Sequence, residues 1–387
     1  MINILYLHAG AEMYGADKIL LELVSHIDRK LFNPLVILPC DGVLKRKLEE
    51  KNVKTYVINY PILRRKYFNA KGILKYSLSY FKRSNEIISL LREIEFKVDI
   101  IHINTMAVLE GIYLKKRLQA KLIWHVHEII EKPKIISDFL NFLVGKYADE
   151  CVAVSVAVKK HLITSKYICD KKVIVIYNGI DSKIFNSNVS YEYLFKDFRI
   201  PVNSIRVGVI GRINSWKGQN DFLDATVPLL EKYPSLYLFI IGSAFSGEEW
   251  RVDKLKDRIL TEKYNSRIIY SPFRRDNAAV QNFLNVLVLP STNPDPLPTV
   301  VLEAMACGKP VVGYAYGGIK EMVKNGYNGY LDPPHNKKAL SQSLDRLIGN
   351  EDKRKILGRN SQKRQKEYFS VSYFVNSFSK VYEQMVG

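Results

Sequence analysis

The chain has 387 residues, 47% of them hydrophobic and 25% charged, and this composition excludes a disordered or low-complexity protein. A chain of this length usually forms two domains. The formal net charge of +19 is spread over both halves, which leaves nucleic acid, an anionic membrane surface and phosphorylated substrates open as partners.

The sequence begins with a short apolar segment that has neither the basic leader nor the cleavage site of a signal peptide. The longest uninterrupted apolar run, Leu236–Ile241, is far too short to span a membrane. The cysteines show neither metal-ligand nor redox spacing: Cys40, Cys151, Cys169 and Cys307. We therefore expect a cytoplasmic protein.

The first half alternates short apolar runs with helical patterns such as Lys18–Ile27. The strand candidates are Ile2–Leu7, Leu35–Leu38, Ile100–Ile103, Leu122–Val126 and Glu150–Val154. Strands that alternate with helices in this way predict a parallel sheet with helices on both faces.

The same alternation restarts in the second half, after a turn signal at Asn178–Asp181. Its strand candidates are Arg206–Ile210, Leu236–Ile241, Arg267–Tyr270, Val286–Leu289 and Val311–Tyr314. We predict an α/β fold of two Rossmann-like domains, residues 1–185 and 186–387, that face a central cleft. The last helix, at about residues 373–385, is able to pack on either domain.

The strongest local signal is the loop Gly211–Gly218, which follows an apolar strand and contains Arg212 and Lys217. Two fixed cations suit a diphosphate, because they stabilise both its bound charge and the charge that develops as it leaves. Two solvated surface charges beside a glycine turn remain the alternative interpretation.

A second signal, Asn293–Ala304, follows another apolar strand and opens a helix. Pro298 fits the first turn of this helix, where the N–H groups of Thr299 and Val300 are able to face an anion. Glu303 lies further along the helix and is able to accept hydrogen bonds from sugar hydroxyls. Asp295 and Glu303 are eight positions apart, and such a pair is often merely solvated.

Histidines end two strands of the first half. His125 and His127 share one face of their strand, and His102 ends another strand. A single histidine is more often structural than catalytic, but two neighbours on one face are stronger candidates.

Taken together, these motifs resemble the retaining glycosyltransferases of family four, which have the glycosyltransferase B fold. The motifs that carry the resemblance are Gly211–Gly218, Asp295–Gly308, Gly317-Gly318 with Glu321, and Asn325–Pro333. Weaker matches in the first half are Tyr14–Asp17, Cys151–Val158 and Asn178–Asp181. The resemblance implies an acceptor-binding N-terminal domain and a C-terminal domain that binds a nucleotide sugar.

The resemblance also implies roles for individual residues. Arg212 and Lys217 match the pair that holds the donor diphosphate, and Glu303 matches the residue that binds the ribose. Asp295 stands where the sugar hydroxyls are contacted, although the family has the longer Glu there. The remaining donor-binding candidates are Gly15 and the backbone of Thr299 and Val300 for phosphate, and Phe273, in the loop Ser271–Arg275, for the base.

For the transferred sugar, His127 gives the best match to the family's histidine, and His125 is the second choice. Pro298 stands where the family often has Gly, and Tyr14 also replaces a common glycine, so the donor sugar stays open. The resemblance implies retention of configuration and no metal or other cofactor, and the sequence has no Asp-x-Asp motif. The acceptor is expected to be a saccharide or a lipid-linked saccharide.

The tract Leu63–Arg83 combines five aromatic residues with seven basic ones and contains no acidic residue. It predicts a landing site on an anionic membrane, or else a basic helix face at the surface. Two other functions remain open: a nucleotide-sugar epimerase or hydrolase on the same fold, and a nucleic-acid binder. No nucleic-acid-binding motif accompanies the charge.

Overall fold

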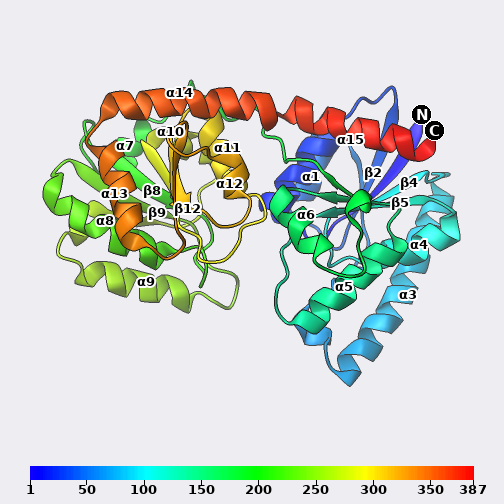
Figure 1. Ribbon diagram of the computed structural model, residues 1–387. Coiled ribbons are helices and arrows are strands. Elements are labelled where there is room, and N and C mark those ends of the chain that lie inside the picture. Colours follow the sequence, from blue (N-terminus) through cyan, green and yellow to red (C-terminus); the bar gives the residue numbers. More distant parts are fainter. The chain divides into compact units, whose positions relative to one another are not determined.

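The computed structural model describes residues 1–387 apart from the side chain of Arg65, and the chain forms two compact units (Figure 1). Arg65 is one of the seven basic residues of the predicted tract, and its side chain therefore lies outside the described residues. The N-terminal unit comprises Met1–Gly179 and Val371–Gly387, and the C-terminal unit comprises Ile180–Ser370.

The division falls after Gly179 rather than after residue 185. The N–H of Ile180 donates to the carbonyl of Phe369 at 3.0 Å, and Gln365 Nε2 donates to the carbonyl of Ile180 at 3.2 Å. These bonds tie Ile180 to the C-terminal unit. Because they join residues far apart in the sequence, a local sequence pattern does not reveal them.

The N-terminal unit contains a seven-stranded parallel sheet with the strand order β3-β2-β1-β4-β5-β6-β7. Its strands are β1 (Ile2–Leu7), β2 (Phe32–Leu38), β3 (Lys54–Val57), β4 (Ile100–Ile103), β5 (Lys121–Val126), β6 (Glu150–Ala153) and β7 (Val173–Val175). Its helices are α1 (Gly15–His26), α2 (Val43–Glu50), α3 (Ala70–Glu93), α4 (Glu110–Leu118), α5 (Lys134–Tyr147), α6 (Val156–Ile163) and α15 (Val371–Val386). Because helices cover both faces, consecutive residues such as Ile4, Leu5, Tyr6 and Leu7 are all buried.

The C-terminal unit contains a six-stranded parallel sheet with the order β10-β9-β8-β11-β12-β13. Its strands are β8 (Ile205–Ile210), β9 (Leu236–Ile241), β10 (Ile268–Ser271), β11 (Val286–Leu289), β12 (Val311–Tyr314) and β13 (Gly329–Asp332). Its helices are α7 (Tyr193–Asp197), α8 (Gln219–Lys232), α9 (Trp250–Thr261), α10 (Asn277–Phe283), α11 (Thr299–Ala306), α12 (Ile319–Met322), α13 (Lys337–Ile348) and α14 (Glu351–Tyr368). The predicted parallel α/β architecture is confirmed in both units.

The strands that the sequence pattern missed lie at the edges of the sheets: β3, β7 and β13. Edge strands are covered less completely, so they lack the continuous apolar runs of central strands. The strand β2 begins at Phe32, three residues before the predicted start at Leu35. The prediction started too late because Pro34 cannot donate a strand hydrogen bond and therefore argues against a strand at this position. Among the described residues, no helix combines the length and hydropathy that crossing a bilayer requires.

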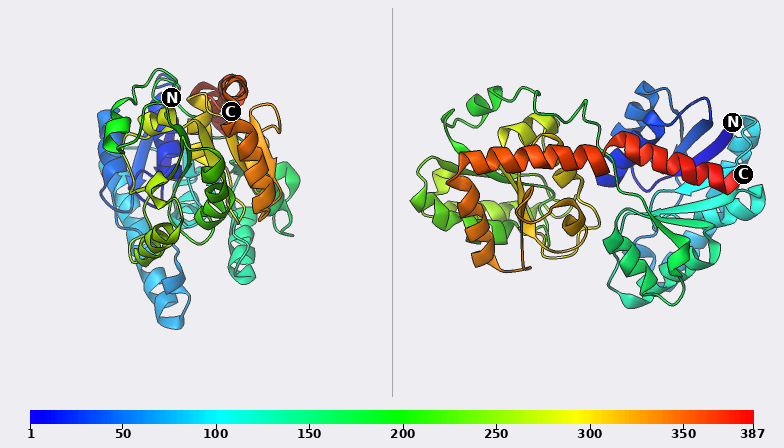
Figure 2. Two further views of the ribbon diagram at one scale, coloured as in Figure 1. Left: turned by 90° about the vertical axis from the view of Figure 1, so that its left-hand side faces the viewer. Right: turned by 45° about the horizontal axis from the view of Figure 1, so that its top comes forward.

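The last helix, α15, packs beside α1 in the N-terminal unit (Figures 1 and 2). Phe374, Phe378 and Tyr382 are buried in the same core cluster as the α1 residues and the β1 and β4 side chains. The Tyr382 hydroxyl contacts both His102 Nδ1, at 2.7 Å, and the Tyr6 hydroxyl, at 3.2 Å. The C-terminal segment is therefore part of the N-terminal core.

We expect Phe378→Ala to lower the free energy of unfolding by about 3–5 kcal/mol, because it leaves a cavity in this core. Urea denaturation measures the change. The matched control is Phe81→Ala on α3, where the ring is 52% exposed and truncation is expected to change the free energy by only about 0.5 kcal/mol. Equal effects of the two variants would show that α15 is not part of the core.

Candidate functional site

The strands β8 and β11 are neighbours in the C-terminal sheet although they are separated along the chain by β9 and β10. The strand order reverses between β8 and β11. Open parallel sheets bind ligands at such a reversal point, beyond the carboxyl ends of the strands. The loop after β8 carries Arg212 and Lys217, and the loop after β11 carries Asp295.

The structure joins these two loops through an ion pair. Lys217 Nζ lies 3.0 Å from Asp295 Oδ1 and 2.8 Å from Oδ2, and Ser291 Oγ donates to Oδ2 at 2.8 Å. The Lys217 side chain is only 15% exposed and that of Asp295 6%, so solvent screens the pair weakly. Asp295, predicted to contact sugar hydroxyls, therefore also fixes the position of Lys217.

A backbone hydrogen bond holds the same two loops close together: the N–H of Thr292 donates to the carbonyl of Trp216 at 2.7 Å. Within the first loop, Asn214 Oδ1 accepts the N–H of Lys217 at 2.9 Å. Gly218 has φ +75°, and a Cβ there would lie 1.9 Å from the carbonyl oxygen of Pro290. Only glycine fits this position, so the position of Lys217 depends on the glycine that follows it.

The loop after β12 contacts the backbone of Asp295. Gly317 forms an isolated parallel bridge with Asp295, and the N–H of Gly318 donates to the Asp295 carbonyl at 2.8 Å. A Cβ on Gly317 would lie 2.2 Å from the Asp295 carbonyl oxygen, and a Cβ on Gly318 would lie 2.0 Å from the Pro296 carbonyl oxygen. The glycine pair of the sequence thus permits close approach of two loops.

Helix α11 begins at Thr299, directly after this loop, and its first turn carries the N–H groups of Thr299 and Val300. Such groups lack acceptors within the helix and favour an anion. Pro298 is the N-cap rather than a residue of the first turn, and Gly308, with φ +71°, follows the helix end. Glu303 is buried in the second turn.

Two other predicted donor residues lie at the same edge of the C-terminal sheet. The guanidinium carbon of Arg212 lies 3.9 Å from the centroid of the Phe245 ring, in cation–π geometry. Phe273 follows the edge strand β10, its ring is 47% exposed, and its N–H donates to Ser243 Oγ at 3.0 Å. The exposed ring is able to stack on a planar group.

In the N-terminal unit, His127 directly follows β5, and its ring lies on the same side as that of His125, with Nδ1 of His125 3.2 Å from Nε2 of His127. His125 is fully buried against Phe378, with ring centroids 4.9 Å apart, and burial holds its pKa well below its usual range. His127 is partly exposed, and burial lowers its pKa to about 3. Of the two, only His127 reaches the surface of this unit.

The next residue, Glu128, fixes the loop that carries His127. Its carboxylate accepts hydrogen bonds from Thr105 Oγ1 and, at 3.0 Å, from the N–H of His127. Burial raises the pKa of Glu128, and the bond from Thr105 opposes this shift. Gly15 is the first residue of α1, at the same carboxyl edge of the sheet.

Sequence reasoning missed two polar residues of this edge, His8 and Asn104. Asn104 Oδ1 lies 3.1 Å from His127 Nε2, and Asn104 Nδ2 lies 3.1 Å from His8 Nδ1. His8 Nε2 in turn contacts the carboxylate of Asp17. The signal was present in the sequence, because His8 and Asn104 each directly follow the last residue of a buried strand.

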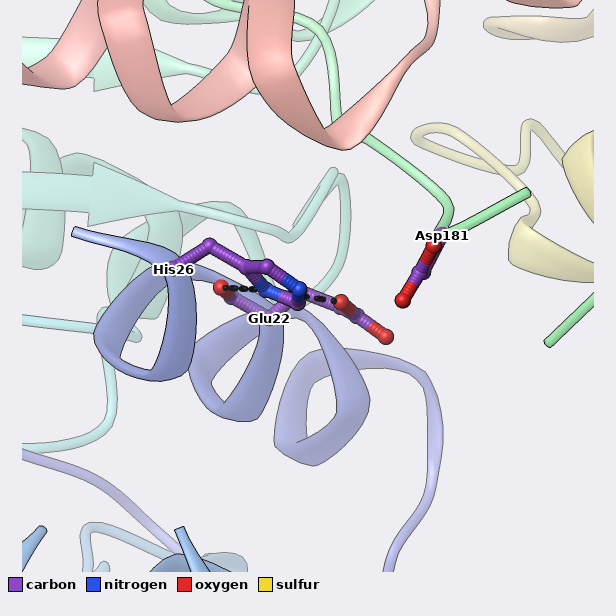
Figure 3. Close-up of side chains that lie close together, drawn as sticks. All are labelled: Glu22, His26 and Asp181. Carbon is purple, nitrogen blue, oxygen red and sulfur yellow. Dashed lines mark hydrogen bonds and ion pairs between the residues drawn. The ribbon is translucent and has the colours of Figure 1, made fainter. Parts of the chain in front are cut away.

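A further acidic and imidazole pair lies on α1, where His26 Nδ1 is 3.3 Å from Glu22 Oε2 (Figure 3). The two residues are one helical turn apart, and because His26 is exposed to solvent the pair contributes little energy.

Comparison with known proteins divides the chain in the same way. A family model described as Glycosyltransferase Family 4 matches residues 13–183, and one described as Glycosyl transferases group 1 matches residues 190–364. An uncharacterized glycosyltransferase of Methanocaldococcus jannaschii is 28% identical over 71% of this chain and 71% of its own length. The capsular polysaccharide biosynthesis glycosyltransferase CapM of Staphylococcus aureus is 26% identical over 65% of this chain and 67% of its own.

Solved structures show the same kinship over the whole chain. HepE of Anabaena, in complex with UDP and glucose, superposes with a TM-score of 0.83 at 26% identity and covers 98% of this chain and 99% of its own. Its complex with UDP-glucose gives a TM-score of 0.84 at 25% identity, covering 99% of this chain and 100% of its own. The chain therefore belongs to the group 1 glycosyltransferases with a family 4 N-terminal half, and it has their glycosyltransferase B fold of two Rossmann-like domains.

Proposed function

We propose that this glycosyltransferase moves a sugar from a nucleoside diphosphate sugar to a saccharide or lipid-linked saccharide acceptor, with retention of configuration. The observation that carries the proposal is that the Lys217–Asp295 pair and the N-terminus of α11 follow the carboxyl ends of the neighbouring strands β8 and β11. HepE was solved with UDP-glucose, which makes this compound the first donor to test.

The cationic side of this site suits the diphosphate. Lys217 supplies an ammonium held in place by Asp295, and Arg212 supplies a guanidinium oriented by Phe245. The first turn of α11 adds backbone N–H groups and the positive end of a helix dipole. Donors that are fixed before the reaction stabilise the leaving diphosphate without reorganising during the step.

The state of Asp295 supports the proposal that retention proceeds without a covalent intermediate. Its carboxylate accepts hydrogen bonds from Lys217 and Ser291, and its side chain is nearly buried, so it is a poor nucleophile. We infer a front-face reaction in which the leaving phosphate takes the proton of the acceptor hydroxyl. The bond from the anomeric carbon to the diphosphate oxygen breaks as the bond to the acceptor oxygen forms.

The proposal of a lipid-linked acceptor is supported by an apolar surface of the N-terminal unit. Helix α3 exposes Ile73, Leu74, Leu78 and Phe81, and α5 exposes Ile135, Phe139 and Phe142. Both helices lie on the same side of this unit (Figures 1 and 2). Lys71, Lys75 and Lys82 are exposed on α3 among these apolar residues, a combination that fits an anionic bilayer carrying a lipid-linked acceptor.

The structure changes which residues of the tract Leu63–Arg83 are proposed to touch the bilayer. Tyr76 and Tyr80 are partly buried, with ring centroids 6.2 Å apart, and burial raises the pKa of both hydroxyls. The exposed apolar surface of α3 is mainly aliphatic instead. Membrane attachment therefore depends on leucines and lysines rather than on the tyrosines.

Turnover of UDP-glucose tests the proposed function directly. We expect Arg212→Ala or Lys217→Ala to lower the rate by roughly 10²-fold, the scale for losing one fixed transition-state donor. Radiolabel release, with and without oligosaccharide acceptors, measures the rate. Lys263→Ala, an exposed lysine in the same unit, is the matched control and should keep full activity. Full activity of both site variants would refute the diphosphate assignment.

We also expect turnover to survive EDTA, because Arg212 and Lys217 provide the positive charge that a divalent ion supplies in other enzymes. The measurement is the rate after dialysis against chelator, compared with the rate after magnesium or manganese is added back. Loss of activity that either metal restores would contradict the metal-independent mechanism.

Vesicle co-sedimentation tests the membrane surface. Binding should need anionic lipid and weaken at high salt, since each Lys near such a surface contributes about 1 kcal/mol. Leu74→Ser with Leu78→Ser should abolish binding, and so should Lys71→Gln, Lys75→Gln and Lys82→Gln combined. Leu260→Ser, an exposed leucine of the C-terminal unit, serves as the control. If neither the leucine nor the lysine substitutions weaken vesicle binding, this surface is not the membrane-binding site.

A further inference from the structure

A continuous line of polar side chains joins the start of α1 to His127. The Asp17 carboxylate contacts His8 Nε2, and Asn104 Nδ2 contacts His8 Nδ1 at 3.1 Å. Asn104 Oδ1 then contacts His127 Nε2 at 3.1 Å. Asp17, His8 and Asn104 are buried, so solvent does not substitute for these partners.

The backbone fixes the orientation of Asn104. Its Nδ2 also lies 3.3 Å from the carbonyl oxygen of Ala16, which is able only to accept a hydrogen bond. Turning the amide over would set Oδ1 against this carbonyl and lose the bond. The NH2 group therefore faces Ala16 and His8, and the amide oxygen faces His127.

The amide oxygen in turn fixes the proton on His127. An oxygen acceptor requires a donor opposite, so Nε2 of His127 carries the hydrogen, and His125 Nδ1 is a second acceptor 3.2 Å away. By the same logic, His8 Nδ1 accepts a hydrogen bond from the Asn104 NH2 group, and His8 Nε2–H donates one to the Asp17 carboxylate. The Asn104 amide therefore defines one tautomer for the His127 ring.

The other ring nitrogen of His127 remains available. Nδ1 makes no hydrogen bond to any described residue, and the side chain is partly exposed. Without a proton, Nδ1 is an acceptor, and the groups it suits are hydroxyl donors. A sugar presents such groups, whereas a phosphate does not.

We propose that Asp17, His8 and Asn104 are positioning residues that hold His127 as the Nε2–H tautomer, so that Nδ1 accepts a hydrogen bond from a hydroxyl of the transferred sugar. This proposal rests on the proposed function. Removing any of the three residues should release the ring without removing the imidazole itself. The burial that lowers the pKa of His127 to about 3 is consistent with a neutral ring.

Nitrogen-15 NMR of histidine-labelled protein tests the tautomer without any substrate. The chain has seven histidines, and the signal lost in His127→Gln assigns the ring of interest. We expect one protonated nitrogen, Nε2, and one bare nitrogen, Nδ1, at pH 7. An Nδ1–H tautomer, averaged tautomers or an imidazolium in the wild-type protein would overturn the proposal, whatever the variants do.

Asn104→Leu then tests the cause. It removes both the donor and the acceptor of the amide at similar volume, and we expect averaged tautomers for His127. The control is Asn141→Leu, which changes another buried asparagine of the same unit outside this line of residues, bonded to Ser137 Oγ at 3.5 Å. A His127 spectrum that stays unchanged in Asn104→Leu would refute the positioning role.

Kinetics with UDP-glucose separates positioning from folding. We expect Asn104→Leu to lower kcat about 10-fold, the scale of losing a residue that orients a functional ligand, with KM changed less than about 2-fold. Combining it with His127→Ala should add little to the loss of His127→Ala alone, because the two act through one contact. Additive losses would contradict the proposal.

The two hypotheses fail in different ways. If the wild-type protein does not turn over any nucleotide sugar, the proposed function fails while the NMR result still decides the tautomer. If turnover is normal but the tautomer is wrong, the positioning role alone is refuted.

Discussion

In a parallel sheet every strand delivers its carboxyl end to the same edge, and this constraint places the candidate residues of both units. In the C-terminal unit it brings Lys217 to Asp295, which lie 78 positions apart in the chain. In the N-terminal unit it brings His8, Asn104 and His127 together at the ends of β1, β4 and β5. The chemistry of each unit is therefore concentrated along one edge, where the loops are free to vary while the covered sheet holds them in place.

Buried polar groups at these edges are stabilised in two different ways. In the C-terminal unit the charges of Lys217 and Asp295 are kept and paired, since a buried charge without a partner is costly. In the N-terminal unit the imidazoles of His102, His125 and His127 are kept neutral instead, because burial lowers the pKa of His102 and His127 to about 3 and that of His125 also. Neutral rings suit the binding of uncharged hydroxyls, whereas a paired ammonium suits a diphosphate.

The basic surface of the chain also divides into parts with different physical roles. Lys217 and Arg212 are held by specific partners, and the lysines of α3 stand exposed beside aliphatic side chains. The first arrangement provides fixed geometry, and the second is the one that we propose for long-range, salt-dependent attraction to a membrane. The net charge of +19 thus combines side chains in two different surroundings, and for this reason composition alone left three classes of partner open.

The sequence by itself determined the parallel α/β architecture, most central strands and the loops that carry Arg212, Lys217 and Asp295, because buried parallel strands leave continuous apolar runs and their loops follow at once. It also placed His125 and His127 on one face, through the two-residue period of a strand. Only the tertiary structure decided that Asp295 anchors Lys217, that Asn104 joins His8 to His127, and that α15 packs behind His125. These contacts join residues from separate strands and from opposite ends of the chain. Hydropathy and spacing describe only neighbours along the sequence, whereas hydrogen bonds of this kind depend on the order in which the strands assemble.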